Sequence, residues 1–422
     1  MHYLDEELKR AGNHPNFAPL LTELVKSNPA LAAGLARHIL QAKIATPLVR
    51  EMPLLLWENS ALTESERLDL LAAAARSPHP GAAASVVAFI RWRSRQANYA
   101  PSNNEAQLLL ELAKQPDPAI AATLLDFCGH ADGPALMLAC QVLETMPVSL
   151  LPPSVAGGVW EVLVPYRKRA MPLPEPVVAR LFQELVAILR LELHQHWQQF
   201  HELAETRPWD TYTLLRNRIL QAAKPETPKN YVPLPEGYDF TIRLPGLTAH
   251  PDFSGICNEL WARVLNRSDP CWHQWRELWQ AVVLTDNDQW LPRMLREAEA
   301  AKTAEELSTI VLLPRFDGSL MVFRFPDLTR TLLKKAQELG GAELLESIHD
   351  SLGFGCGPMV REYAGGVLEK DCDYVEAEAV KAAEAHASDP ILGPFYRWIV
   401  QREQEDRLRH KARSDAEMAA LD

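Results

Sequence analysis

The chain has 422 residues, of which 47% are hydrophobic, and its formal net charge is −12 at pH 7. This hydrophobic fraction is typical of a folded protein and excludes a largely disordered one. The acidic balance argues against non-specific binding of nucleic acid by the whole surface, because it repels phosphates.

The cysteines and the N-terminal residues indicate the compartment. None of the six cysteines forms a Cys-x-x-Cys pair, and most stand in apolar, helical surroundings. We therefore expect reduced thiols in a cytoplasmic protein. The first ten residues lack the apolar core of a signal peptide, and no run of about 18 apolar residues predicts a transmembrane helix.

The first part of the sequence predicts successive helix pairs joined by short corners. Ala and Leu dominate these stretches, and proline falls at helix starts, where its missing N–H costs little. Thr63 and Glu66 have capping-box spacing, which marks the start of a helix. The expected helices cover residues 3–12, 16–25, 30–41, 46–57, 63–76, 80–95, 103–114, 118–128, 134–145 and 154–164.

One of these pairs occurs twice. Residues 71–90 and 109–128 each end one helix, turn at a Pro-x-Pro corner and begin a second helix. Pro118 corresponds to Pro80, 38 residues earlier, and other small and apolar positions correspond at the same spacing. A repeated supersecondary unit indicates a chain built of stacked helix pairs.

The corner Asp117-Pro118, followed by Ala-Ile-Ala-Ala, resembles the start of the second helix in HEAT-type repeats. The resemblance covers roughly the first 165 residues. The arginine that many such repeats carry after the proline is absent, and Ala121 and Ala122 stand in that region. The resemblance implies an α-solenoid of antiparallel helix pairs, whose usual role is scaffolding or recognition.

A change of pattern divides the chain. The longest uninterrupted helical pattern runs over residues 174–206, and 209–223 predicts a further helix. Six prolines then fall within 224–253, a density that no helix survives. We interpret this segment as a linker or a crossing loop between an N-terminal lobe, 1–223, and a C-terminal lobe, 254–422.

The C-terminal lobe is predicted to be mainly helical. A helix over 326–339 is expected to stop at Gly340-Gly341, and Thr303 has capping-box spacing with Glu306. The pair Gly357-Pro358 recurs as Gly393-Pro394, which indicates a second internal repeat. Further helices are expected over 255–264, 270–284 and 289–301.

One stretch of this lobe could form a small β-element. Two apolar runs flank Asp317-Gly318, a dipeptide typical of tight hairpins. One interpretation is a β-hairpin at 310–325, accompanied by the alternating stretch 238–244; the other is a helix that ends near Leu313. The expected fold class is all-α, a HEAT-like antiparallel helix-pair solenoid in two lobes with a small β-hairpin insertion.

Trp272, Trp275 and Trp279 have the i, i+3, i+7 spacing of one helix stripe. A packed core stripe is the favoured interpretation. The alternative is a partner-binding groove, because Trp and Arg are frequent in recognition hot spots and Arg263 and Arg276 are close in sequence. These five residues are the candidate partner-binding site.

Basic residues follow the second helices of two predicted pairs. Stacked repeats would bring them along one edge, where they could bind an anion or the phosphates of a nucleic acid. A solvated surface explains the same pattern more simply. The residues of this predicted basic strip are Arg91, Arg93, Arg95, Arg167, Lys168 and Arg169.

A group of histidines and glutamates invites a metal-site interpretation. His194 and His201 are seven residues apart and so share a helix face, but the His-Glu-x-x-His order is missing. A polar helix face is the favoured explanation, and we assign no metal site, catalytic residue or cofactor. The group comprises Glu192, His194, His196, His201, Glu202 and Glu205.

The sequence thus favours a non-enzymatic cytoplasmic scaffold or adaptor that binds a protein partner. The expected binding surfaces are the concave face of residues 60–165 and the region 261–279. One alternative is a nucleic-acid-binding or DNA-repair-type HEAT-like protein that uses the basic strip. A second alternative is a metal-dependent hydrolase that uses the histidine group.

Overall fold

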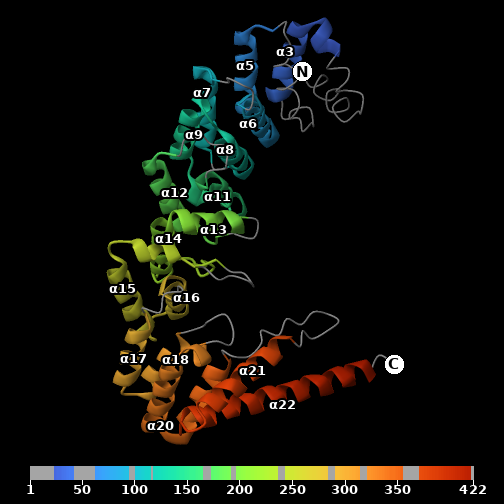
Figure 1. Cartoon of the computed structure of the whole chain (residues 1–422). Coiled ribbons are helices and arrows are strands. Elements are labelled where there is room, and N and C mark those ends of the chain that lie inside the picture. Colours follow the sequence, from blue (N-terminus) through green and yellow to red (C-terminus); the bar gives the residue numbers. More distant parts are fainter. Residues whose placement is uncertain are drawn as a thin grey trace. The chain divides into compact units, whose positions relative to one another are not determined.

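The computed structural model is built of helices, as Figure 1 shows. It describes residues 23–41, 62–94, 100–115, 117–164, 173–191, 196–235, 243–283, 290–313, 321–354 and 370–419. Within these ranges there are nineteen α-helices, two short 3-10 helices and no strand, which confirms the all-α class. The chain divides into two compact units, Met1–Phe240 and Thr241–Asp422.

The helices of the first unit follow one another closely. Their bounds are α3 (Pro29–Gln41), α5 (Glu64–Ala75), α6 (Pro80–Ser94), α7 (Asn103–Ala113), α8 (Pro118–His130), α9 (Pro134–Thr145), η1 (Val148–Leu150), α10 (Pro153–Ala156), α11 (Gly158–Leu163), α12 (Glu175–Ala187), α13 (Trp197–Thr206) and α14 (Pro208–Ala222).

These helices pack in two rows. One row is formed by successive contacts of α5 with α7, α7 with α9, α9 with α12, and α12 with α14. The other row is formed by contacts of α6 with α8, α8 with α11, and α11 with α13. Cross-contacts such as α5 with α6, α7 with α8 and α13 with α14 join the two rows, and Figure 1 shows both. The apolar core of this unit therefore runs between the rows.

The repeated sequence unit buries the same positions in both copies. Phe89 of α6 and Phe127 of α8 are both fully buried, and so are Ile90 and its counterpart Cys128. The same correspondence holds for the remaining buried pairs of these two helices: Ala82 with Ile120, Ala83 with Ala121, Val86 with Leu124, and Val87 with Leu125. Positions that are 38 residues apart thus correspond in their burial in the core as well as in residue type.

Local capping explains where several of these helices begin. The Thr63 side chain accepts a hydrogen bond from the Glu66 N–H at 3.3 Å, and the Glu66 carboxylate accepts one from the Thr63 N–H at 2.9 Å. This reciprocal pair confirms the predicted capping box. Asp117 caps α8 by accepting from Ala119 N and Ile120 N, while Pro118 occupies the first helical position.

The predicted long helix over 174–206 was wrong. α12 ends at Ala187, because Ile188 adopts an extended backbone with φ −67° and ψ 133°. The next described helix, α13, begins only at Trp197. The freed carbonyls at the end of α12 are satisfied by a residue far away in the sequence, Arg218 of α14.

Arg218 is fully buried and holds the end of α12 to the segment that follows α14. Burial lowers the pKa of its guanidinium to about 10, so the group stays charged at neutral pH. Three of its partners are carbonyls at the negative end of α12, which stabilise a buried cation without a carboxylate. At 2.6 to 3.2 Å, it donates to the carbonyls of Leu185, Val186, Ile188, Val232 and Pro233.

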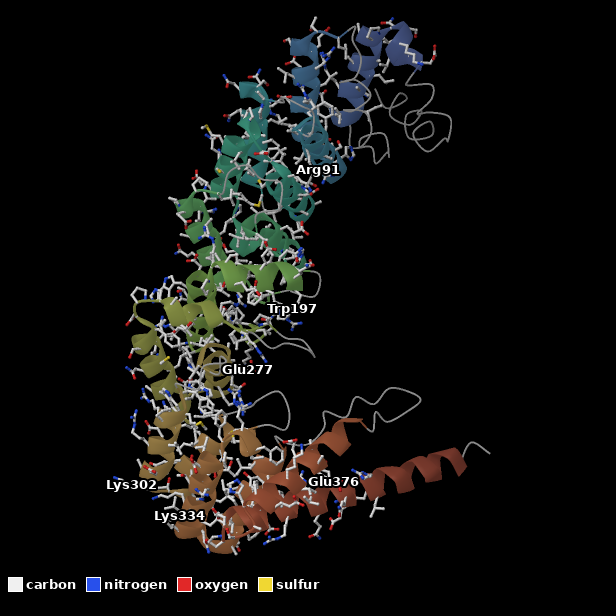
Figure 2. All side chains as sticks on the ribbon, viewed as in Figure 1. Arg91, Trp197, Glu277, Lys302, Lys334 and Glu376 are labelled. Carbon is white, nitrogen blue, oxygen red and sulfur yellow. The ribbon has the colours of Figure 1, made fainter. Side chains whose placement is uncertain are left out.

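The second unit is also helical. Its helices are η2 (Pro245–Ala249), α15 (Phe253–Leu265), α16 (Trp272–Val283), α17 (Leu291–Ala300), α18 (Ala304–Leu312), α19 (Met321–Arg324), α20 (Pro326–Phe354), α21 (Lys370–Ala385) and α22 (Leu392–Ala419). α15 packs on α16 and α18, while α17 and α18 pack on α20. α21 and α22 form a pair, in which Glu376 of α21 (labelled in Figure 2) accepts a hydrogen bond from Gln404 of α22 at 2.9 Å.

The predicted β-hairpin at 310–325 was wrong in the part that the structure describes. Residues 310–312 belong to α18, and residues 321–324 form α19. The Thr303–Glu306 capping box at the start of α18 favours helix over this stretch, so the alternative of a helix ending near Leu313 is confirmed. The turn Asp317-Gly318 and most of 238–244 lie outside the described residues.

The predicted stop at Gly340-Gly341 is a break in the path of α20. Gly341 has φ 61° and ψ −143°, a backbone conformation that only glycine adopts readily, and helix resumes after it. Gly393-Pro394 lies in the first turn of α22, whereas Gly357-Pro358 lies outside the described residues. In the described part of the chain, every helix is too short or too polar to span a membrane.

Candidate functional site

The predicted tryptophan stripe lies on the inner face of α16. Trp272, Trp275 and Trp279 are 6%, 1% and 0% exposed. Trp279 packs edge-to-face on Trp261 of α15, with ring centroids 5.3 Å apart. This burial favours the core interpretation, because an indole that fills the space between two helices does not form an open groove.

Hydrogen bonding fixes the outermost of the three indoles. Trp272 donates from Nε1 to the Val264 carbonyl of α15 at 2.7 Å. Asp269 shapes the corner between the two helices by accepting from Cys271 N at 2.8 Å. The corner is therefore a defined structure that holds the side chains around it in place.

Arginines cover the outer faces of these indoles. The Arg263 guanidinium lies 4.9 Å from the Trp275 ring centroid, and Arg276 lies 5.3 Å from that of Trp272. Arg267, which is exposed, lies 5.5 Å from the same Trp272 ring. We name these three arginines with Trp272 and Trp275 the arginine–tryptophan cluster. Such cation–π contacts orient the guanidinium groups at the surface.

The charge of the cluster is partly balanced. Arg263 forms an ion pair with Asp269 at 3.5 Å, and the Asp269 side chain is only 10% exposed. No ion pair of Arg267 is found among the described residues. Arg267 is thus the member whose charge is most available to a ligand.

The predicted basic strip is only partly described. Arg91, labelled in Figure 2, forms an ion pair with Asp126 of α8, and Arg93 pairs with Glu105 of α7 at 3.2 Å. These two contacts neutralise much of the charge that a phosphate would need. The other four members, Arg95, Arg167, Lys168 and Arg169, lie outside the described residues.

The predicted histidine group is dispersed where it is described. His196 lies 3.6 Å from Glu161 of α11, whereas the His201 ring packs against Trp197, with centroids 3.9 Å apart. Burial lowers the pKa of His201. Figure 2 labels Trp197 on α13. The described residues contain no group of three potential ligands that could hold a metal, and Glu192 and His194 are not among them.

Sequence reasoning did not select Arg37 and Arg76, which line a recess between α3 and α5. A signal for this recess exists in the repeat. Ala72 and Ala73 of α5 correspond, 38 residues on, to the larger Leu110 and Glu111 of α7.

No protein-family model, no curated protein and no solved structure matches the chain.

Proposed function

We propose that the chain is a non-enzymatic scaffold that binds a protein partner through the surfaces of stacked helix pairs. One observation carries this proposal: the helices of the first unit pack in two rows, with matching core positions 38 residues apart. Stacked helix pairs of this kind are the building plan of α-solenoids, which use their extended surfaces for recognition. A HEAT-like solenoid is the finer form of the proposal.

The arginine–tryptophan cluster is the proposed contact site in the second unit. Arg267 is exposed, and it stacks on Trp272. This stacking already restricts the side chain to few rotamers, so that less conformational entropy is lost when a partner binds. An arginine held in this way suits a carboxylate on a partner surface. The buried indoles then serve as the support of the contact rather than as the contact itself.

The test is chemical crosslinking and affinity capture with the full chain in native lysate. We expect a stable protein partner whose recovery falls with Arg267→Ala but not with Lys302→Ala, a charge-matched change at an exposed residue of the same unit (labelled in Figure 2). Failure to recover any stable partner would reject the scaffold function. Equal recovery with both variants would keep the scaffold and reject the cluster as its contact site.

The proposed compartment is the cytoplasm, on the basis of the cysteine pattern in the sequence. Cell fractionation tests it directly, and recovery in an oxidising compartment would contradict it. Nucleic-acid binding through the basic strip remains a separate proposal, and a mobility shift that weakens steeply with salt would support it.

A further inference from the structure

A polar recess of about 510 Å³ lies between the end of α3 and the second half of α5. Arg37 and Gln41 contribute to it from α3, Asp69 contributes from α5, and Arg76 contributes from the C-cap position just after α5. Its volume lies within the range of about 300–1,000 Å³ that is typical of ligand sites. Arg37, Asp69 and Arg76 are exposed, so the recess is open to an extended ligand that enters from solvent.

The recess exists because α5 carries small residues where the sister repeat carries large ones. Ala72 and Ala73 line it, and their counterparts 38 residues later in α7 are Leu110 and Glu111. Two alanines leave space that a leucine and a glutamate would occupy. The recess is thus a departure from the repeat rather than a property of every helix pair.

A cross-helix hydrogen bond holds the recess open at one end. The Ser77 hydroxyl, just after α5, donates to the Leu40 carbonyl of α3 at 2.8 Å. The same hydroxyl accepts from His79 N at 3.3 Å, which ties in the corner before α6. The two walls are therefore fixed relative to each other before a ligand arrives, which lowers the cost of binding.

The charges in the recess are not used internally. Among the described residues, Arg37, Asp69 and Arg76 form no ion pair. Hydrogen bonds from the backbone N–H and the hydroxyl of Thr63 to Glu66 Oε2, at 2.9 and 2.8 Å, are the main cause of the lowered pKa of Glu66, and the charge of Arg37 contributes less. Two guanidinium groups and one carboxylate therefore face the recess, with a net positive charge in an acidic protein.

We propose that this recess is a docking site for an acidic peptide segment of a protein partner. Carboxylates of the peptide pair with Arg37 and Arg76, while its backbone N–H groups donate to Asp69. The alanine floor accepts the peptide backbone at close range. The proposal rests on the proposed scaffold function, because it names the kind of partner that one surface takes.

The experiment measures binding of fluorescein-labelled hexaglutamate to the full chain by fluorescence anisotropy at low salt. Hexaglutamine is the uncharged control peptide. We expect hexaglutamate to bind and hexaglutamine not to bind, with the affinity falling as salt is raised from about 50 to about 200 mM. Absence of binding, or equal binding of the two peptides, would overturn the proposal.

Three variants locate the site. Arg37→Ala with Arg76→Ala should weaken binding about tenfold or more, because both charged partners are lost. Ala72→Leu with Ala73→Glu installs the residues of the sister repeat, fills the recess and should abolish binding. Arg190→Ala, at an exposed arginine of the same unit, should change the affinity less than about twofold. Wild-type affinity in the filled variant would overturn the site.

Circular dichroism checks the fold of each variant. If Arg37→Ala with Arg76→Ala unfolds, Arg37→Gln with Arg76→Gln replaces it. Displacement of hexaglutamate by an equal concentration of inorganic phosphate would indicate a free-anion site and overturn the peptide assignment. If the variant Ala72→Leu with Ala73→Glu loses hexaglutamate binding but still recovers the protein partner from lysate as wild type does, the recess is rejected as the docking site of that partner, while the scaffold function stands.

Discussion

The Arg218 guanidinium and the Tyr231 hydroxyl donate hydrogen bonds to the same acceptor, the carbonyl of Val186. The guanidinium also lies 4.7 Å from the Tyr231 ring centroid. Burial raises the pKa of the Tyr231 hydroxyl to about 12, so it stays a donor across the physiological range. The two residues together hold the end of α12 to the chain after α14.

Arg218→Met should strongly destabilise the first unit. The change keeps much of the side-chain volume but leaves four carbonyls without their side-chain donor, while the Val186 carbonyl keeps the Tyr231 hydroxyl. We expect a loss of about 3–5 kcal/mol in the free energy of unfolding. Urea denaturation, with hydrogen exchange of α12 and α14, measures it. Arg190→Ala is the control and should stay within about 0.5 kcal/mol of wild type. If Arg218→Met changed the free energy of unfolding as little as Arg190→Ala, the hydrogen bonds from Arg218 to these carbonyls would not be important for stability.

The two capping boxes of the first unit should contribute unequally to its free energy of unfolding. Glu105 is 1% exposed, caps Ser102 N at 2.8 Å and also pairs with Arg93, whereas Glu66 caps Thr63 at the surface. Glu105→Ala should therefore cost about 2–3 kcal/mol in the free energy of unfolding, and Glu66→Ala clearly less. Urea denaturation of both variants tests this order, and equal losses would contradict it.

The stability of the second unit should depend on the protonation of His349. Its ring packs against Phe395 and Trp398 of α22, with centroids 5.1 and 5.3 Å away, and burial lowers its pKa despite the acidic neighbours Glu346 and Asp350. The unfolded chain thus binds this proton more readily than the folded one. Stability should fall as the pH drops below the unfolded pKa of about 6.5, towards the folded pKa.

The variant His349→Phe separates this effect from general acid denaturation. Phenylalanine keeps an aromatic ring against Phe395 and Trp398 but cannot take up a proton. When the pH is lowered from about 7 to about 5, the interval in which a free histidine takes up its proton, the melting temperature should fall less in the variant than in wild type. Parallel pH profiles would show that His349 does not titrate in this way.

The buried indole of Trp279 should contribute far more to stability than the exposed indole of Trp209. Trp279 is 0% exposed, whereas Trp209 is 41% exposed. Trp279→Ala should cost about 3–5 kcal/mol through the cavity that it leaves, and Trp209→Ala about 1 kcal/mol or less. Chemical denaturation of the full chain measures both losses. A small loss in the free energy of unfolding with Trp279→Ala would contradict the assignment of this indole to the core.

Local signals in the sequence predicted much of the helical pattern. The capping box at Thr63 and the Asp117-Pro118 corner specify helix starts through atoms only two or three residues apart. The break after Ala187 could not be predicted in this way, because the group that stabilises it, Arg218, is about thirty residues away in sequence. The tryptophan stripe shows a different limit: helical spacing is the same for a core face and for a surface groove.

The recess between α3 and α5 illustrates the same point for the functional site. Its arginines, Arg37 and Arg76, carry no motif, and they meet only because two helices pack side by side. The alanine pair Ala72-Ala73 was visible in the repeat, but its meaning depends on the neighbouring wall. Similarly, Asp317-Gly318 is a strong local turn signal, yet the described helices on either side exclude the predicted hairpin.

The backbone conformation of Gly341 affects how sequence variation at this position should be interpreted. Its backbone conformation restricts the position to glycine, although a side chain there would meet no neighbouring atom within 4 Å. The position should therefore be constant among homologues and intolerant in a mutational scan, as a ligand-binding residue would be. Constancy at this glycine reports the path of the backbone through α20, and it should not be counted as a mark of a binding site.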